Sequence, residues 1–301
     1  MRRIWGMFVL CGALGAFVAP TARAQSDAVA PPLAADGSNK GANDFRFGIS
    51  PFNSAGALLR IHQPLRDFLG KSLKRNVVMF SARDHESFFF NALDDQYDLV
   101  IAPIHFVPRI VDHGYVPLVR YRNPLDLMMV VRKSAGIASA EDLRGRRVGL
   151  PDRLSLYNIV GMQWLRSLPL KVGVDYELTE YPSHLAEIIA VDADKLDVAL
   201  TASPTWMQLD PGIRERLTLI DIGYQKMPSM TLLARRKLGK AMIARLYDAL
   251  EDFARSPEGK KFFAATGYGG FVKATNRDVK KAHQYETLMR QTYGDGPSPA
   301  R

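Results

Sequence analysis

Residues 147–158 read Arg-Val-Gly-Leu-Pro-Asp-Arg-Leu-Ser-Leu-Tyr-Asn. A short apolar run ends in a Pro-Asp turn, and apolar residues at helical spacing follow it. A strand, a tight turn and a helix start in this order turn free backbone N–H groups and the positive end of the helix dipole toward one point. Such a turn can seat a small anion, with further donors from Arg153, Ser155, Tyr157 and Asn158. The alternative is an ordinary loop in which Asp152 or Ser155 only caps the helix.

The same rhythm of short apolar strands and amphipathic helices continues on both sides of this stretch. It predicts an α/β fold with mostly parallel sheets and helices on their faces. About 250 structured residues are enough for two lobes with sizeable cores. The predicted strands are 45–50, 77–80, 99–102, 115–122, 125–132, 147–150, 176–181, 198–201, 217–222 and 230–234.

An internal echo supports two similarly built halves. A histidine and two aspartates, followed by an apolar strand, recur at an offset of 99 residues. Each set predicts a helix, a short acidic turn and a buried strand, and it occurs only twice, which excludes a solenoid. The paired residues are His85 and His184, Asp95 and Asp194, and Asp98 and Asp197.

The loops that follow the predicted strands carry short hydrogen-bonding side chains. In open α/β sheets, ligands bind beyond the carboxyl ends of the strands. These loops hold no cluster of metal ligands, so we predict a polar ligand pocket without a metal or cofactor. The candidate ligand-binding residues are Asn53, Ser54, Ser81, His105, Arg153, Ser155, Tyr157, His184 and Thr201.

The N-terminal segment predicts export. Residues 1–24 combine a basic start, an apolar run and the small-residue pattern Ala22-Arg23-Ala24, which is typical of a signal peptide cleaved before Gln25. The single cysteine, Cys11, lies inside this segment and follows the large Leu10, which argues against a lipid anchor. Residues 25–43 lack periodicity and predict a flexible leader. We therefore expect a periplasmic protein without disulfides.

The charge balance argues against some classes of partner. The chain has 40 Lys and Arg against 31 Asp and Glu, and three of the basic residues lie in the signal segment. The rest are spread thinly, so nucleic acid is not an expected partner, while an anionic ligand is favoured. A hydrolase could be imagined from Ser155 and His184, with Asp152 or Asp197 as orienting group, but no G-x-S-x-G or S-x-x-K context supports it. We therefore expect no enzyme activity.

Five further stretches carry a resemblance to a known family: 47–50 (Phe-Gly-Ile-Ser), 63–69 (Gln-Pro-Leu-Arg-Asp-Phe-Leu), 97–100 (Tyr-Asp-Leu-Val), 141–149 (Glu-Asp-Leu-Arg-Gly-Arg-Arg-Val-Gly) and 196–199 (Leu-Asp-Val-Ala). In their order and spacing the chain resembles the phosphate/phosphite/phosphonate-binding family of periplasmic ABC-transporter solute-binding proteins. The resemblance covers residues 45 to about 271.

The resemblance implies a two-lobed type II periplasmic-binding fold, with two crossover strands between the lobes and the ligand cleft between them. Lobe 1 would comprise residues 44–132 and 224–301, and lobe 2 residues 133–223. By hinge closure, a monomer would capture a small oxyanion and deliver it to an ABC permease in the inner membrane. A second possibility is that it reports its ligand to a membrane sensor kinase.

The resemblance also assigns two site positions. The family's Ser-Thr-Ser-Gly turn matches residues 153–156, where only Ser155 is kept, and its binding histidine matches His184. Arg153 would replace the lost hydroxyls with a bidentate donor, or it is a surface residue. First-lobe aromatics that contact the phosphonate in relatives are not clearly kept, since Ala-Pro stands at 102–103. No carboxylate lies around 203–205 or 227–229, which argues against aminoethylphosphonate and leaves phosphate, phosphite, a small phosphonate or another anion.

Overall fold

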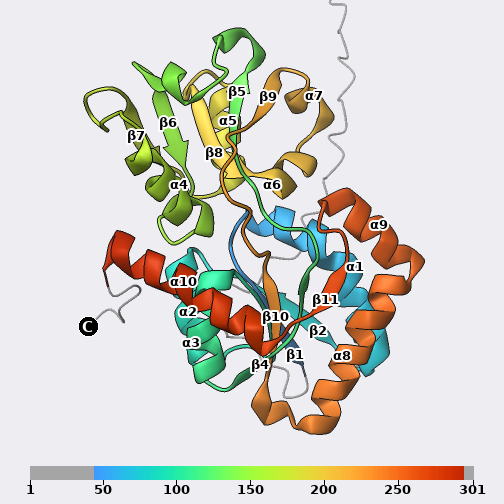
Figure 1. Ribbon diagram of the computed structural model, residues 1–301. Helices are drawn as coiled ribbons and strands as arrows, with labels where there is room; N and C mark the ends of the chain where they lie inside the picture. Colours follow the sequence, from blue (N-terminus) through green and yellow to red (C-terminus); the bar gives the residue numbers. More distant parts are fainter. Residues whose placement is uncertain (1–43, 295–301) are drawn as a thin grey trace, which may run out of the picture. The chain divides into compact units, whose positions relative to one another are not determined.

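The computed structural model describes residues 44–294, which form two β-sheets with helices packed against them (Figure 1). The predicted signal peptide and leader lie outside the described residues. Within residues 44–294, no helix combines the length and the apolar character needed to cross a membrane.

The first sheet has six strands in the order β11-β4-β10-β3-β1-β2. Helices α1, α8 and α9 cover one of its faces, and α2, α3 and α10 cover the other (Figure 1). The strands are β1 (Phe45–Ile49), β2 (Val77–Phe80), β3 (Leu99–Ala102), β4 (Tyr115–Tyr121), β10 (Thr231–Arg235) and β11 (Phe271–Lys273). The helices are α1 (Ala55–Leu73), α2 (His85–Leu93), α3 (Val107–Asp112), α8 (Lys240–Arg255), α9 (Pro257–Thr266) and α10 (Asn276–Tyr293).

The second sheet has five strands in the order β7-β6-β8-β5-β9. Its strands are β5 (Leu127–Arg132), β6 (Arg147–Leu150), β7 (Glu177–Glu180), β8 (Val198–Ala202) and β9 (Leu217–Asp221). Its helices are α4 (Leu156–Ser167), α5 (His184–Asp192), α6 (Ser203–Met207) and α7 (Pro211–Arg214). Short 3₁₀ turns complete the chain: η1 (Ile104–Phe106), η2 (Lys133–Ala135), η3 (Ala140–Leu143) and η4 (Arg236–Leu238).

Both sheets are mixed, which corrects the expectation of mostly parallel sheets. Strands β1, β2 and β3, and likewise β6, β7 and β8, run parallel because helices connect them in βαβ units. Strands β10 and β5 each lie antiparallel to both of their neighbours, and β11 is antiparallel to β4. Strands β5 and β10 enter their sheets from segments that cross between the two lobes, so no helical crossover fixes a parallel direction.

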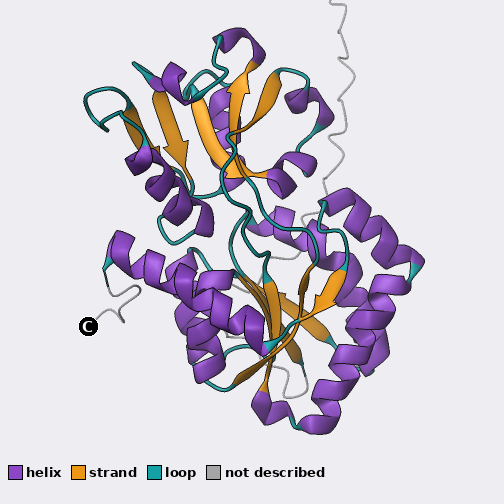
Figure 2. Cartoon of the chain, viewed as in Figure 1, coloured by secondary structure: helices purple, strands orange, loops and turns teal. Residues whose placement is uncertain are grey.

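Two crossing segments, 122–126 and 222–230, connect the sheets as extended loops (Figure 2). They pair with each other, because the backbones of Leu125 and Met227 exchange two hydrogen bonds of 2.8 Å. Strand β5 follows the first crossing and pairs with β8 and β9. The second sheet therefore begins with β5, before the predicted lobe boundary between residues 132 and 133.

The internal echo is confirmed in the backbone. Asp95 and Asp194 both adopt left-handed conformations, with φ of 58° and 57°, in the turns that follow α2 and α5. Aspartate tolerates this conformation better than most residues. Asp98 and Asp197 each accept a 2.8 Å hydrogen bond from a backbone N–H at the start of β1 or β6. The two halves therefore place α2 and α5 in equivalent positions.

Candidate functional site

A cavity of about 50 Å³ lies among loops of both lobes. This space suits a few water molecules or a small ligand. Its apolar wall consists of Phe52, Pro103, Ile104, Leu125, Leu156, Ala202, Pro204 and Met230. Its polar lining consists of Ser50, His85, Ser155, Tyr157, His184, Thr205, Gln208 and Tyr268.

The turn before α4 is held rigidly beside this cavity. The side chain of Asn158 donates a 2.5 Å hydrogen bond to the carbonyl of Pro151, and Asp152 Oδ1 accepts one of 2.8 Å from the N–H of Leu154. Ser155 is the N-cap of α4, and its Oγ accepts from the N–H of Tyr157 at 3.3 Å. These bonds present the hydroxyl of Ser155 and the first turn of α4 to the cavity.

His184 connects Ser155 to a buried acid. Its Nε2 lies 3.3 Å from Ser155 Oγ, and its Nδ1 lies 3.3 Å from Glu187 Oε1 and 3.1 Å from Thr201 Oγ1. Burial raises the pKa of Glu187 well above its usual value, against the hydrogen bond from Thr201, and so favours the protonated carboxyl. Burial also lowers the pKa of His184 to about 3, helped by His85. A neutral acid can donate to Nδ1, which places the imidazole proton on Nε2, facing Ser155.

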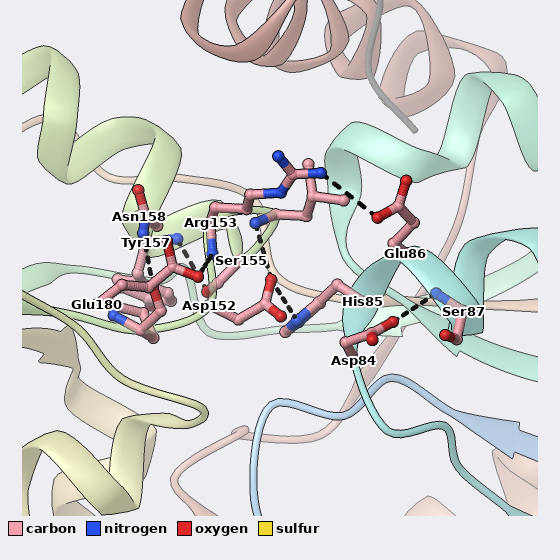
Figure 3. A network of polar contacts seen from close by, with 12 residues as sticks. Asp84, His85, Glu86, Ser87, Asp152, Arg153, Ser155, Tyr157, Asn158 and Glu180 are labelled. Atoms are coloured by element: carbon pink, nitrogen blue, oxygen red, sulfur yellow. Dashed lines mark hydrogen bonds and ion pairs between the residues drawn. The ribbon is translucent and has the colours of Figure 1, made fainter. Parts of the chain in front are cut away.

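Three contacts join the turn before α4 to the first lobe. His105 Nε2 donates to the carbonyl of Leu154 at 2.9 Å, and His85 Nδ1 lies 3.3 Å from Asp152 Oδ1. Arg153 reaches Glu86 at 3.4 Å, directed away from Asp152 and His85 (Figure 3). Burial raises the pKa of Asp152, but its bonds with His85 and with backbone N–H groups outweigh this and hold the pKa below its usual value. Asp152 is therefore a carboxylate at the edge of the site.

Four polar side chains on the cavity wall have buried atoms without a hydrogen bond of good geometry in the described part of the chain: Ser50 Oγ, Tyr157 Oη, the amide of Gln208, and His85 Nδ1, which has only the contact with Asp152. Burial raises the pKa of Tyr157 well above its usual value, so its hydroxyl keeps its proton. An unpaired buried polar group costs about 1–3 kcal/mol. Such groups mark a place where a ligand or ordered water supplies the missing partner.

Comparison with known proteins agrees with this geometry. Residues 47–279 match the family model described as "ABC transporter, phosphonate, periplasmic substrate-binding protein". The chain belongs to this family. It is therefore a solute-binding protein that captures a small anionic solute for an ABC importer. The family is one of periplasmic transport proteins, and its members bind small anionic ligands and work with an ABC permease.

Solved structures confirm the type II periplasmic-binding fold. The binding-protein component of an ABC phosphonate transporter from Pseudomonas aeruginosa has a TM-score of 0.69 at 18% identity, over 83% of this chain and 87% of that one. PhnD1 from Prochlorococcus marinus, in complex with methylphosphonate, has a TM-score of 0.70 at 14% identity, over 83% and 99%. The alkanesulfonate-binding protein SsuA from Xanthomonas axonopodis pv. citri has a TM-score of 0.58 at 13% identity, over 84% and 94%. A search of curated protein sequences finds no significant match.

The binding protein brings only part of the predicted residue set to the cavity. Ser155, Tyr157 and His184 line it. Thr201 does not line the cavity, but its Oγ1 contacts Nδ1 of His184. His105 does not line the cavity either, and it binds the carbonyl of Leu154.

The predicted loop residues of the first lobe have local structural contacts instead. Ser54 is the N-cap of α1, and its N–H donates to Asn53 Oδ1 at 3.0 Å. Ser81 donates its hydroxyl proton to the carbonyl of Ile49 at 2.9 Å. None of these three side chains lines the cavity.

Of the two roles predicted for Arg153, this structure favours the surface residue, since the side chain is 53% exposed and lies 3.4 Å from Glu86. The backbone N–H of Arg153 donates to Glu180 rather than into the cavity. A guanidinium keeps its hydration or finds a carboxylate, and the cavity wall offers it no carboxylate.

Sequence reasoning did not select Ser50, His85 and Gln208, which line the cavity. Ser50 directly follows β1, and it was passed over for the loop residues beyond it. His85 had a clear signal, because the internal echo pairs it with His184, and both line the cavity. Gln208 follows the short helix α6, and no pattern in the sequence distinguishes it from a surface glutamine.

Proposed function

We propose that the protein binds a small phosphonate with an uncharged, apolar substituent in this cavity and delivers it to its permease. The supporting observation is the set of unpartnered donors on the wall, which come from the end of β1 in the first lobe (Ser50), from α4 (Tyr157) and from the C-cap of α6 (Gln208) in the second. Oxygens of a phosphonate would accept hydrogen bonds from Ser50, Tyr157 and Gln208, and from the His184–Ser155 pair. A ligand that needs donors from both lobes favours their closed arrangement.

The other part of the cavity supports an apolar substituent. Ile104, Leu125, Met230 and their apolar neighbours supply contacts but no hydrogen bonds. Among the described residues on the wall there is no carboxylate to hold an ammonium group. A buried ammonium without a partner is costly, so aminoalkylphosphonates should bind more weakly than alkylphosphonates.

The Ser155–His184–Glu187 arrangement resembles a hydrolase triad in connectivity, and we propose that it serves binding instead. A general base works best with a pKa near the working pH, whereas the pKa of His184 is lowered to about 3. A neutral Glu187 also provides no negative charge to stabilise an imidazolium. The chain from Glu187 through His184 then fixes which hydrogen bonds Ser155 accepts and which it offers to the ligand.

We further propose that the two crossing segments act as the hinge between the lobes. The predicted bounds are 44–132 plus 224–301 for lobe 1 and 133–223 for lobe 2, and we move β5 (Leu127–Arg132) from lobe 1 to lobe 2 because it pairs with β8 and β9. The mature form would be a periplasmic monomer. Intact-mass measurement of protein recovered from the periplasm should give a chain that begins at Gln25. A mass that retains residues 1–24 would contradict cleavage after Ala24.

Calorimetric titration of the mature protein with methylphosphonate tests the site. We expect Tyr157→Phe and Ser50→Ala each to weaken binding about 10- to 100-fold, because each removes one hydrogen bond to an anion. Arg153→Ala is the matched control from the same turn, and its affinity should stay within about twofold of the wild type. Equal losses in all three variants, or a large loss in Arg153→Ala alone, would argue against this cavity.

A further inference from the structure

We infer that the cavity selects the singly charged form of its ligand, so that a phosphonate binds with one acidic proton retained. This inference rests on the proposed function and adds to it the charge state of the ligand. It depends on which charges surround the cavity and on which hydrogen-bonding atoms remain unpaired there.

No side chain with a permanent positive charge lies on the described wall of the cavity, and the imidazole of His85 lies beside the carboxylate of Asp152. The wall, as far as the chain is described, contains neither lysine nor arginine, and Arg153, the nearest arginine in sequence, is engaged with Glu86. The titratable side chains on the wall are His85, Tyr157, His184 and Tyr268. Behind them lie His105, Glu187 and Asp152.

Asp152 makes the local field unfavourable for a second negative charge. Its side chain is only 15% exposed and lies 3.3 Å from His85, which faces the cavity. Against the larger effect of burial, the carboxylate also raises the pKa values of His184 and His105, two further imidazoles beside the turn before α4. The cost of burying an ion rises steeply with its charge, and a neighbouring carboxylate adds repulsion. A monoanion held by neutral donors avoids most of both costs.

The retained proton has an acceptor in the cavity. The buried amide nitrogen and amide oxygen of Gln208 make no hydrogen bond of good geometry in the described structure, and the amide lies within reach of the Tyr268 hydroxyl on the same wall. The nitrogen suits an ionised oxygen of the ligand, and the oxygen suits a P–OH group. A fully ionised ligand would offer the amide oxygen no proton. The wall therefore carries the donors and the acceptor that a hydrogen-phosphonate needs.

Titration calorimetry with methylphosphonate between about pH 6 and pH 8.5 tests this inference. Methylphosphonate loses its second proton near neutral pH, whereas methanesulfonate keeps a single charge throughout. The association constant for methylphosphonate should fall about tenfold per pH unit above the ligand's second pKa, and that for methanesulfonate should not change. Titrations in buffers of different ionisation enthalpy should also show uptake of about one proton per methylphosphonate bound at the alkaline end.

The outcomes separate the two proposals. Absence of methylphosphonate binding at every pH would contradict the proposed function itself. Binding that stays constant or strengthens toward pH 8.5, without proton uptake, would contradict only the charge selection. Asp152→Asn keeps the oxygen that accepts from Leu154, and it should raise the affinity at pH 8.5 more than at pH 6. If this variant does not fold, the proton uptake measured with the wild type still tests whether the cavity selects the singly charged ligand.

Discussion

Acidification from pH 6.5 to 4.5 is expected to destabilise the protein by about 2.7 kcal/mol per pH unit. Burial lowers the pKa of His62 to about 4 and the pKa values of His105 and His184 to about 3. In the unfolded chain these three histidines bind protons as the pH falls through about 6.5, whereas in the native state they stay neutral at that pH. The stability from these histidines is thus present above pH 6.5 and lost as the pH falls toward their native pKa values.

Glu187 opposes this trend. Its native pKa is raised by burial, so the native state already holds a proton that the unfolded chain releases above its ordinary pKa. Its contribution to stability is present at low pH and lost as the pH rises through the native pKa. The net difference is about two protons, which gives the slope above. Since domains of this kind have about 5–15 kcal/mol of stability, unfolding should set in above pH 4.

Urea unfolding at a series of pH values measures this slope, and two variants separate its parts. His62 lies between Phe52 and Phe262, outside the cavity wall, and His62→Leu should reduce the slope to about 1.4 kcal/mol per pH unit. Glu187→Gln removes the opposing group and should steepen it to about 4 kcal/mol per pH unit. A stability that is flat between pH 6.5 and 4.5 would mean that the buried imidazoles are protonated in the native state.

The elements of each half could be predicted from the sequence because their causes are local. Apolar periodicity and caps such as Ser155 and Ser183 determine where α4 and α5 begin. The directions of β5 and β10 could not be predicted, because they depend on where the chain crosses between sheets. A short buried strand can have the same hydrophobic pattern whether it is parallel or antiparallel, so the pattern does not indicate its direction.

The site residues also fall into those with a local sequence signature and those without one. Ser155 and His184 were found because a turn before a helix has a local signature. Ser50 and Gln208 were missed because their importance lies in unpaired atoms that only the assembled cavity reveals. A turn sequence does not state which side of it is desolvated, so the sequence left open whether Arg153 faces the ligand or the solvent, where the structure pairs it with Glu86. The sequence repeat pairs His85 with His184, so His85 could have been predicted as a site residue from the same pattern.

Gly259→Ala is expected to lower the free energy of unfolding by about 3 kcal/mol or more. Gly259 lies in the first turn of α9, where the chain folds back after α8, and its N–H donates to Ser256 Oγ at 2.9 Å. A Cβ atom here would lie 1.7 Å from the backbone carbonyl oxygen of Phe253. That oxygen already accepts from the hydroxyl of Ser256 at 2.8 Å, so the corner between the helices must open.

The expected loss corresponds to a fall in Tm of roughly 6–12 °C for a chain of this size. Gly56→Ala is the matched control, because Gly56 is exposed in the first turn of α1 and its nearest neighbour would be the flexible end of Arg60 at 3.7 Å. That variant should be neutral or gain up to about 1 kcal/mol from helix propensity. Because the two substitutions add the same methyl group to a helix start, only the contact with Phe253 distinguishes them. Equal stabilities would therefore show that the α8–α9 corner can relax around a side chain.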